Sequence, residues 1–267
     1  MRIENLQDDS WTAWDGTSQV GAMSVWRSPD GRCRLYFNGC QADAYGPLSA
    51  AIDGQCYAYV PLSDEAAQAA LREAGFAGSR VEHNYRVPVR SIDAPVPPGI
   101  RFCTVDEAAA EQVMLLDCAI RQDIPGSDGW QPDMEFFRQQ TYDEPRDPSA
   151  YLIAADGAAY VGAAHVGAAH VGAAAYVGAA YVGLVRVWLP EREGAARRLG
   201  CIGVLPGYRK RGLARALVGA VFAVLTAQGV AEVTCEIDDA NTASKALFTS
   251  LGAVAEGGTI ELMRPRD

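Results

Sequence analysis

Residues 91–99, with the sequence SIDAPVPPG, divide the chain, because three prolines and a glycine interrupt any regular helix or strand. We predict a domain at residues 1–92, a linker at 93–99 and a second domain at 100–267. In the second part, apolar runs of strand type alternate with helical segments after an initial hairpin. This alternation predicts an α/β (α+β) fold with a mixed sheet.

The second half also contains tandem units of Ala-Ala-Tyr-Val-Gly and Ala-Ala-His-Val-Gly, and residues 157–185 include no Asp, Glu, Lys or Arg. An uncharged run of this length is formally a candidate membrane span. Glycine at every fifth position weakens a helix, however, and His165 and His170 are costly in lipid. We therefore predict a low-complexity insertion at residues 158–183, without a membrane span. The spacing of the two histidines does not favour a shared metal ion, and we expect no metal site.

Composition narrows the possible partners. The chain has 267 residues, with 23 Lys+Arg against 33 Asp+Glu and a formal net charge of -10. Such an excess of acid repels phosphate backbones, so we expect no nucleic-acid partner. The seven cysteines form no Cys-x-x-Cys pair, which argues against a disulfide framework or a zinc knuckle. The first residues lack the basic start and apolar core of a signal peptide, and we expect a cytoplasmic monomer or homodimer.

A basic cluster stands at one predicted strand-to-helix turn. Residues 198–204 are predicted to form a strand and residues 209–228 a helix, with Arg209, Lys210 and Arg211 just before Gly212. Free N–H groups at a helix start bind anions, and glycine lets a phosphate approach the backbone closely. The helix dipole disfavours cations at the N-terminal end of a helix. A negatively charged ligand bound there would offset this cost and would explain why three cationic residues stand together.

The segment around this turn resembles the acyl-CoA pyrophosphate loop of the GNAT acyltransferase superfamily, whose pattern is Arg/Gln-x-x-Gly-x-Gly/Ala. Here it reads Val204-x-Pro-x-Tyr208-Arg209-x-x-Gly212-x-Ala214. Residues 239–252 resemble the same family's later Asn-x-x-Ala/Ser…Leu-Tyr-x-x-x-Gly-Phe segment, and the likeness extends from about residue 101 to 265. The resemblance implies acetyl-CoA as the cosubstrate and no metal.

The same resemblance implies a GNAT fold. This is a twisted, mostly antiparallel mixed sheet flanked by helices, in which two parallel strands, here residues 198–204 and 232–237, separate in a V. The N-terminal half resembles a smaller, partial GNAT-like domain, and we expect it to bind no coenzyme. A weak echo between residues 70–88 and 247–265 favours an internal duplication.

Most of the binding residues are also implied by the resemblance. Backbone amides near residues 202–204 would hold the acyl carbonyl, and residues 209–214 would bind the pyrophosphate. Two further polar residues would touch the pantetheine or the adenine. The full set is Ile202, Gly203, Val204, Arg209, Lys210, Arg211, Gly212, Leu213, Ala214, Asn241 and Ser244.

The catalytic acid and base are less well defined. Family members often use a glutamate on the separated strand as base, but residues 198–204 contain no carboxylate. The candidate bases are Glu236, Asp123 and Asp128. The family's tyrosine acid falls on Phe248, which cannot donate a proton, although a thiol with a pKa of about 8.5 can leave as thiolate. Cys201 is interpreted as a small buried residue and not as a nucleophile.

These observations favour an acetyl-CoA-dependent N-acetyltransferase that moves an acetyl group to the primary amine of a small molecule. The amine would attack directly in a ternary complex. The negative net charge favours a cationic acceptor such as an amino sugar or a polyamine. Two alternatives stay open: an acetyltransferase for protein N-termini or lysines, and a non-catalytic acyl-CoA sensor or partner-binding module.

Overall fold

The computed structural model describes residues 1–267 except 8, 128, 144–145, 158–179, 191–194 and 267. Most of the predicted insertion therefore lies outside the described residues. The chain splits into two compact units. Unit 1 comprises Met1–Tyr85, Glu236–Thr242 and Ala255–Asp267, and unit 2 comprises Arg86–Cys235 and Ala243–Val254. Each compact unit therefore contains segments that are distant in sequence. The domain boundaries at residues 92 and 100 stay a prediction.

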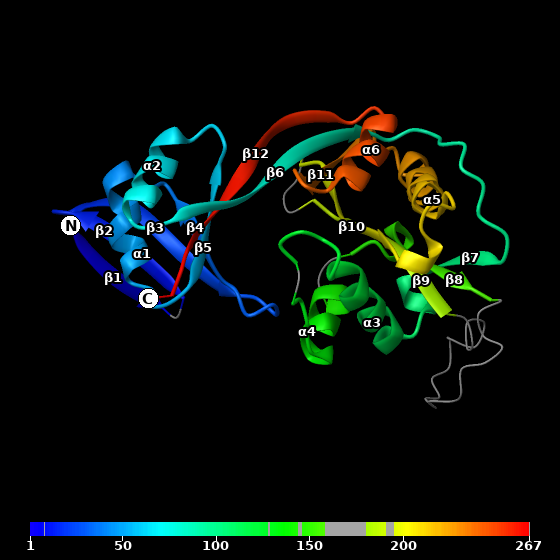
Figure 1. Ribbon diagram of the computed structural model, residues 1–267, viewed down its shortest axis with the longest axis horizontal. Helices are drawn as coiled ribbons and strands as arrows, with labels where there is room; N and C mark the ends of the chain where they lie inside the picture. Colours follow the sequence, from blue (N-terminus) through cyan, green and yellow to red (C-terminus); the bar gives the residue numbers. More distant parts are fainter. Residues whose placement is uncertain (8, 128, 144–145, 158–179, 191–194, 267) are drawn as a thin grey trace. The chain divides into compact units, whose positions relative to one another are not determined.

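Unit 1 is a mostly antiparallel sheet with two helices (Figure 1). Its strands, in spatial order, are β1 (Arg2–Gln7), β2 (Ser10–Asp15), β3 (Ser18–Arg27), β4 (Cys33–Asn38), β5 (Cys56–Pro61), β12 (Val254–Arg264) and β6 (Ala77–Pro88). The helices are α1 (Tyr45–Ala50) and α2 (Glu65–Glu73), with a 3-10 turn at η1 (Ala42–Ala44). The last strand of the chain, β12, pairs with β5 in antiparallel register from Thr259↔Pro61 to Arg264↔Cys56.

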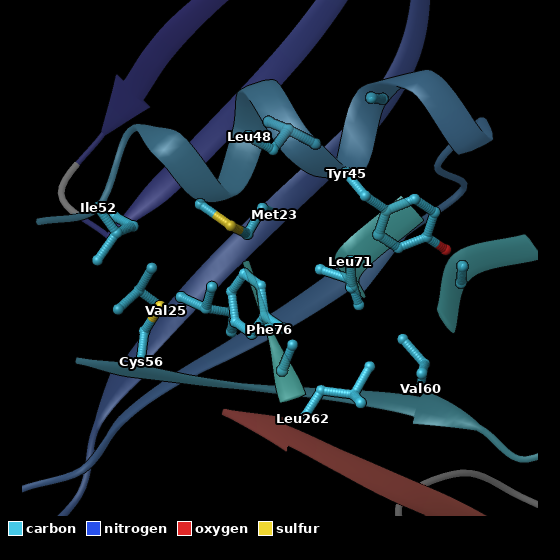
Figure 2. Close-up of a cluster of buried hydrophobic side chains, with 14 of the residues drawn as sticks. Met23, Val25, Tyr45, Leu48, Ile52, Cys56, Val60, Leu71, Phe76 and Leu262 are labelled. Carbon is cyan, nitrogen blue, oxygen red and sulfur yellow. The ribbon is translucent and has the colours of Figure 1, made fainter. Parts of the chain in front are cut away.

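The core of unit 1 lies between its sheet and its helices. Apolar residues at alternate positions of β3 and β5 point to one face of the sheet, as the two-residue period of a strand requires. Figure 2 shows these side chains gathered against those of α1, with Leu262 of β12 at the edge of the cluster. The fully buried members include Leu35, Leu48, Ala58, Leu71 and Leu262.

Unit 2 has the strand order β11-β10-β9-β8-β7 (Figure 1). The strands are β7 (Ile100–Thr104), β8 (Tyr151–Asp156), β9 (Ala180–Trp188), β10 (Arg197–Val204) and β11 (Glu232–Asp238), whose last residues belong to unit 1. The helices are α3 (Ala110–Arg121), α4 (Met134–Arg138), α5 (Leu213–Ala227) and α6 (Thr242–Ser250). Shorter turns are η2 (Val105–Glu107), η3 (Gln139–Asp143), η4 (Pro148–Ala150) and η5 (Pro206–Tyr208). No helix among the described residues is both long and apolar enough to cross a membrane.

The parallel pair of unit 2 is short. Only Arg197↔Val233 and Arg198↔Thr234 join β10 to β11, whereas β10 stays paired with β9 as far as Val204↔Gly183. Two residue pairs likewise join the parallel strands β4 and β5 of unit 1. The predicted fold class, a mixed and mostly antiparallel sheet in which two parallel strands separate, is confirmed.

The weak sequence similarity between residues 70–88 and 247–265 is accompanied by the same type of helix ending. Gly75 ends α2 and Gly252 ends α6, each with a φ of 87°. In both cases the next residue donates to a carbonyl five residues earlier at 3.0 Å, from Phe76 to Leu71 and from Ala253 to Phe248. A left-handed glycine with this bond is a standard helix ending, and here both copies lead into a long strand.

Candidate functional site

The start of α5 is built by the turn that follows β10. Gly212 is the N-cap residue, with φ 81° and ψ -2°, and no side chain caps the helix. The first backbone bond into the helix runs from the Ala216 N–H to the Gly212 carbonyl at 3.0 Å. The N–H groups of the three residues between them therefore have no acceptor within the helix. Such a helix start can bind an anion.

The conformation of the turn favours glycine at residue 212. A β-carbon placed on Gly212 would meet nothing within 4 Å, so packing leaves that position open. The φ of Gly212 is positive, and a residue with a side chain is strained in that conformation. Lys210 has a side chain and a φ of 63°, so its backbone is strained in the same way. Open space beside unbonded amides fits the approach of a phosphate group. The predicted loop thus has unbonded amides and open space at the helix start.

Three exposed cationic residues precede this helix start, and two of them have defined contacts. Arg209 donates from Nε to the Val204 carbonyl at 2.8 Å and pairs with the carboxylate of Asp123. The guanidinium carbon of Arg211 lies 5.4 Å from the ring centroid of Tyr208. The three cations therefore directly precede the end of α5 at which a negative ligand would be stabilised.

The backbone of β10 is fixed by two close contacts. A β-carbon on Gly203 would lie 2.1 Å from Cγ2 of Ile120 in α3, and one on Gly200 would lie 1.9 Å from Nε1 of Trp188. The register of β10 on β9 shifts between Leu199 and Cys201, which places Gly200 at a bulge. These glycines let α3 and the indole pack directly on the strand. The contacts fix the amides of residues 202–204, which the resemblance assigns to the acyl carbonyl.

The candidate bases have different surroundings. Asp123 lies in the loop after α3, and its carboxylate, 49% exposed, pairs with Arg209. Asp128 lies outside the described residues. Glu236 is exposed on the part of β11 that belongs to unit 1 and has interaction partners. Of these three, the structure brings Asp123 to the predicted coenzyme loop.

Asn241 and Ser244, predicted to touch the coenzyme, lie at the start of α6. The Asn241 N–H donates to the Asp238 carbonyl at 2.9 Å within unit 1, and Ser244 lies in the first turn of the helix, in unit 2. Both have interaction partners in the structure. Their roles toward the coenzyme stay predictions.

Two buried residues limit the chemistry. Cys201 is 7% exposed, and burial raises the pKa of its thiol to about 12. It therefore stays protonated near neutral pH, in agreement with its interpretation as a core residue and not as a nucleophile. Phe248 is 1% exposed, so the position of the family's tyrosine holds an apolar core side chain.

A largely buried polar group, formed by Asp117 and Arg121 of α3 with Arg186 of β9, was not predicted from the sequence. Arg121 donates to Asp117 at 2.7 Å, while Arg186 of β9 places its guanidinium carbon 3.2 Å from the ring centroid of Trp188. Burial lowers the pKa of Arg186 to about 10, although nearby Tyr151 and Asp117 oppose this change. The i, i+4 spacing of Asp117 and Arg121 could have indicated their pair. No local signal marked Arg186.

Comparisons with known proteins agree with this geometry. Residues 121–253 match the sequence profile of the acetyltransferase (GNAT) family. A GCN5-related N-acetyltransferase from Sphaerobacter thermophilus has a TM-score of 0.67 at 18% identity, with 99% of this chain and 84% of that chain covered. A tandem GNAT protein from the clavulanic acid biosynthesis pathway has a TM-score of 0.60 at 16% identity, over 95% of this chain and 81% of that chain.

A GCN5-related N-acetyltransferase from Kribbella flavida has a TM-score of 0.58 at 14% identity, over 100% of this chain and 90% of that chain. At such identities the likeness concerns the fold. A search of curated proteins found no match. The sequence profile and the shared fold lead to one assignment: the chain contains a domain of the acetyltransferase (GNAT) family.

Proposed function

We propose that this protein is an acetyl-CoA-dependent N-acetyltransferase that acts on the primary amine of a small molecule by direct attack in a ternary complex. One observation carries the proposal. The left-handed Gly212 leaves the start of α5 uncapped and open, beside a run of three cationic residues. This arrangement supports the binding of a diphosphate.

We propose the following roles for the chain's own residues. When bound, acetyl-CoA supplies a thioester carbonyl that an amine can attack. The amides at the start of α5 and Arg209 would hold the diphosphate, while amides of residues 202–204 would donate to the carbonyl oxygen. A carboxylate would accept the amine proton, with Glu236, Asp123 and Asp128 as the candidates.

The class of the amine acceptor is proposed from the net charge of the chain. A formal net charge of -10 favours the approach of a cation, such as an amino sugar or a polyamine. An amine acceptor must lose its proton before it attacks, because an ammonium group has no lone pair. A base at the site would therefore be needed near neutral pH, where most amines are protonated.

A second candidate function is a non-catalytic acyl-CoA sensor, and Phe248 favours it. Its buried ring, 1% exposed, cannot protonate a leaving thiolate. The sensor would bind the same coenzyme through the same loop. Turnover is therefore the property that separates the two candidates.

The test combines binding with turnover. Calorimetry would measure the affinity for acetyl-CoA, and thiol release would be followed with amino sugars, polyamines and a peptide bearing a free N-terminus and lysine. Release with a small amine would support the proposal, and release with the peptide alone would support a protein acetyltransferase. Binding without release from any amine would support the sensor. Absence of binding would refute all three readings.

Replacing Asp123 by asparagine should tighten coenzyme binding. The Asp123 carboxylate pairs with Arg209 and competes with the diphosphate for the same guanidinium. The pair is about half exposed on both sides, so its loss should change affinity only about two- to fivefold. Calorimetry with coenzyme A would measure the change, with Glu135→Gln on the exposed face of α4 as the matched control. Weaker binding by Asp123→Asn would show that the carboxylate supports the loop.

A further inference from the structure

A cavity of about 780 Å³ opens within unit 1. Its volume is within the range of small-molecule sites, about 300–1,000 Å³. Its walls come from the turn between β3 and β4, the loop between α1 and β5, and the end of the chain at and after the last residue of β12. The parallel strands β4 and β5 are paired only near their first residues, so they separate toward their ends. The cavity borders Cys33 and Gln55 at the starts of these strands, away from the place where they separate.

The walls of this cavity carry more positive than negative charge. Arg27, Arg264 and Arg266 line it, together with one acidic residue, Asp53, among the residues that the structure describes. None of the three arginines forms an ion pair with a carboxylate of the described part of the chain. The chain as a whole has a formal net charge of -10, so a surplus of cations in one cavity is unusual for it. Neighbouring cations repel each other, and a bound anion would offset that cost.

Arg264, the last residue of β12, is held in place before any ligand binds. It donates from Nη1 to the Ser49 carbonyl at 3.1 Å and from Nη2 to the Ile52 carbonyl. Its guanidinium carbon lies 5.3 Å from the ring centroid of Phe76. A guanidinium has more N–H donors than these two carbonyls use, so donors remain for a ligand. Because the side chain is already ordered, little further conformational freedom is lost on binding.

The thiol of Cys33 marks the point at which two of the arginines come together. Burial raises the pKa of this thiol, and the positive charges of Arg27 and Arg264 oppose the rise, while Asp9, which does not line the cavity, adds to it. The thiol therefore stays protonated near neutral pH and supplies no counter-charge to the two arginines. Two guanidinium groups that converge in this way suit a ligand with more than one negative charge.

We infer that this cavity binds a small organic anion that carries two or more negative charges on phosphate or carboxylate groups. The planar guanidinium matches the oxygens of both groups. Arg264 would supply the fixed contact, and the exposed Arg27 and Arg266 would pair with the remaining charge. Ile52 and Pro265 also line the cavity and would contact the carbon skeleton. The inference goes beyond the proposed function, because unit 1 supplies every lining residue and the start of α5 belongs to unit 2.

Calorimetry with citrate and with inorganic pyrophosphate tests the inference, and the comparison separates a carboxylate ligand from a phosphate ligand. Both probes would be titrated into the full chain carrying Gly212→Asp, because the start of α5 is a second place at which an anion could bind. At least one probe should bind this parent chain, and added salt should weaken the binding. Arg27→Gln and Arg266→Gln should each reduce the affinity by about tenfold, the loss of one charge-assisted contact.

The matched control is Arg2→Gln, which removes one positive charge from unit 1 at a side chain that is 63% exposed and does not line the cavity. It should change the affinity by no more than about twofold. Arg264 is left in place because its bonds hold the loop before β5, and thermal unfolding checks that each variant keeps the fold. The inference is overturned if neither probe binds the parent chain, or if neither arginine variant weakens the binding.

Discussion

Replacing Gly212 by aspartate is expected to weaken coenzyme binding by at least about 100-fold. The new carboxylate would stand beside the uncapped amides of α5, where the diphosphate is proposed to lie, and would repel it. A side chain at a φ of 81° also costs about 1–2 kcal/mol for most residues, less for aspartate. Calorimetry with coenzyme A measures the loss, and thermal unfolding shows whether the fold is kept.

Two variants separate charge from backbone strain. Gly212→Asn has nearly the size of aspartate and tolerates the same left-handed conformation, but it carries no charge. It should lose less affinity than Gly212→Asp. Gly229→Asp introduces the same residue at a φ of 75° beyond the other end of α5 and should leave binding intact. Normal coenzyme affinity in Gly212→Asp would reject the assignment of the loop.

The strand-to-helix turn of the candidate site was predictable because its signal is local. Residues 204–214 combine a strand end, a glycine and three cationic residues within one turn, and the structure places them at the start of α5. The helix was predicted to begin at residue 209, but it begins at Leu213. The positive φ angles of Lys210 and Gly212 prevent an earlier start. The contact between Arg209 and Asp123 joins residues 86 apart. No spacing rule could have indicated it.

The fold was least predictable where strands or helices lack a clear pattern. The strand β1 has no fully buried residue that would give a two-residue alternation, so no pattern predicts it. The six-residue helix α1 contains glycine and proline, which are poor helix formers. The antiparallel register of β12 on β5 joins residues about 200 apart in sequence. Sequence periodicity alone does not specify such partners.

An ion network in unit 1 was not predictable from the sequence. Arg80 of β6 donates to Glu82 at 2.6 Å, to Asp238 at 3.2 Å and to Glu261 at 3.1 Å. The side chains of Asp238 and Glu261 are only 5% and 2% exposed. Tyr59 donates to Glu261 as well, and burial together with this carboxylate raises the pKa of Tyr59 to about 12. Arg80 is therefore the cation shared by two buried carboxylates.

Replacing Arg80 by methionine should lower the free energy of unfolding by about 3–5 kcal/mol, because Asp238 and Glu261 would lose the cation between them. A buried carboxylate without a nearby cation is costly only while it is charged, so acid reduces that cost. The deficit should therefore shrink between neutral pH and about pH 4.5, as chemical unfolding at several pH values would show.

Arg86→Met is the matched control on the same strand, because its pair with Glu232 is 3.7 Å long and nearly half exposed on both sides. It should cost less than about 1 kcal/mol. Adding Glu261→Leu to Arg80→Met should restore part of the loss, since it removes one of the two buried carboxylates that Arg80 contacts. Asp238 is two residues from Glu236, so the same network fixes the strand that bears one candidate base. A loss below about 1 kcal/mol in Arg80→Met, with no dependence on pH, would mean that the buried carboxylates do not need this arginine.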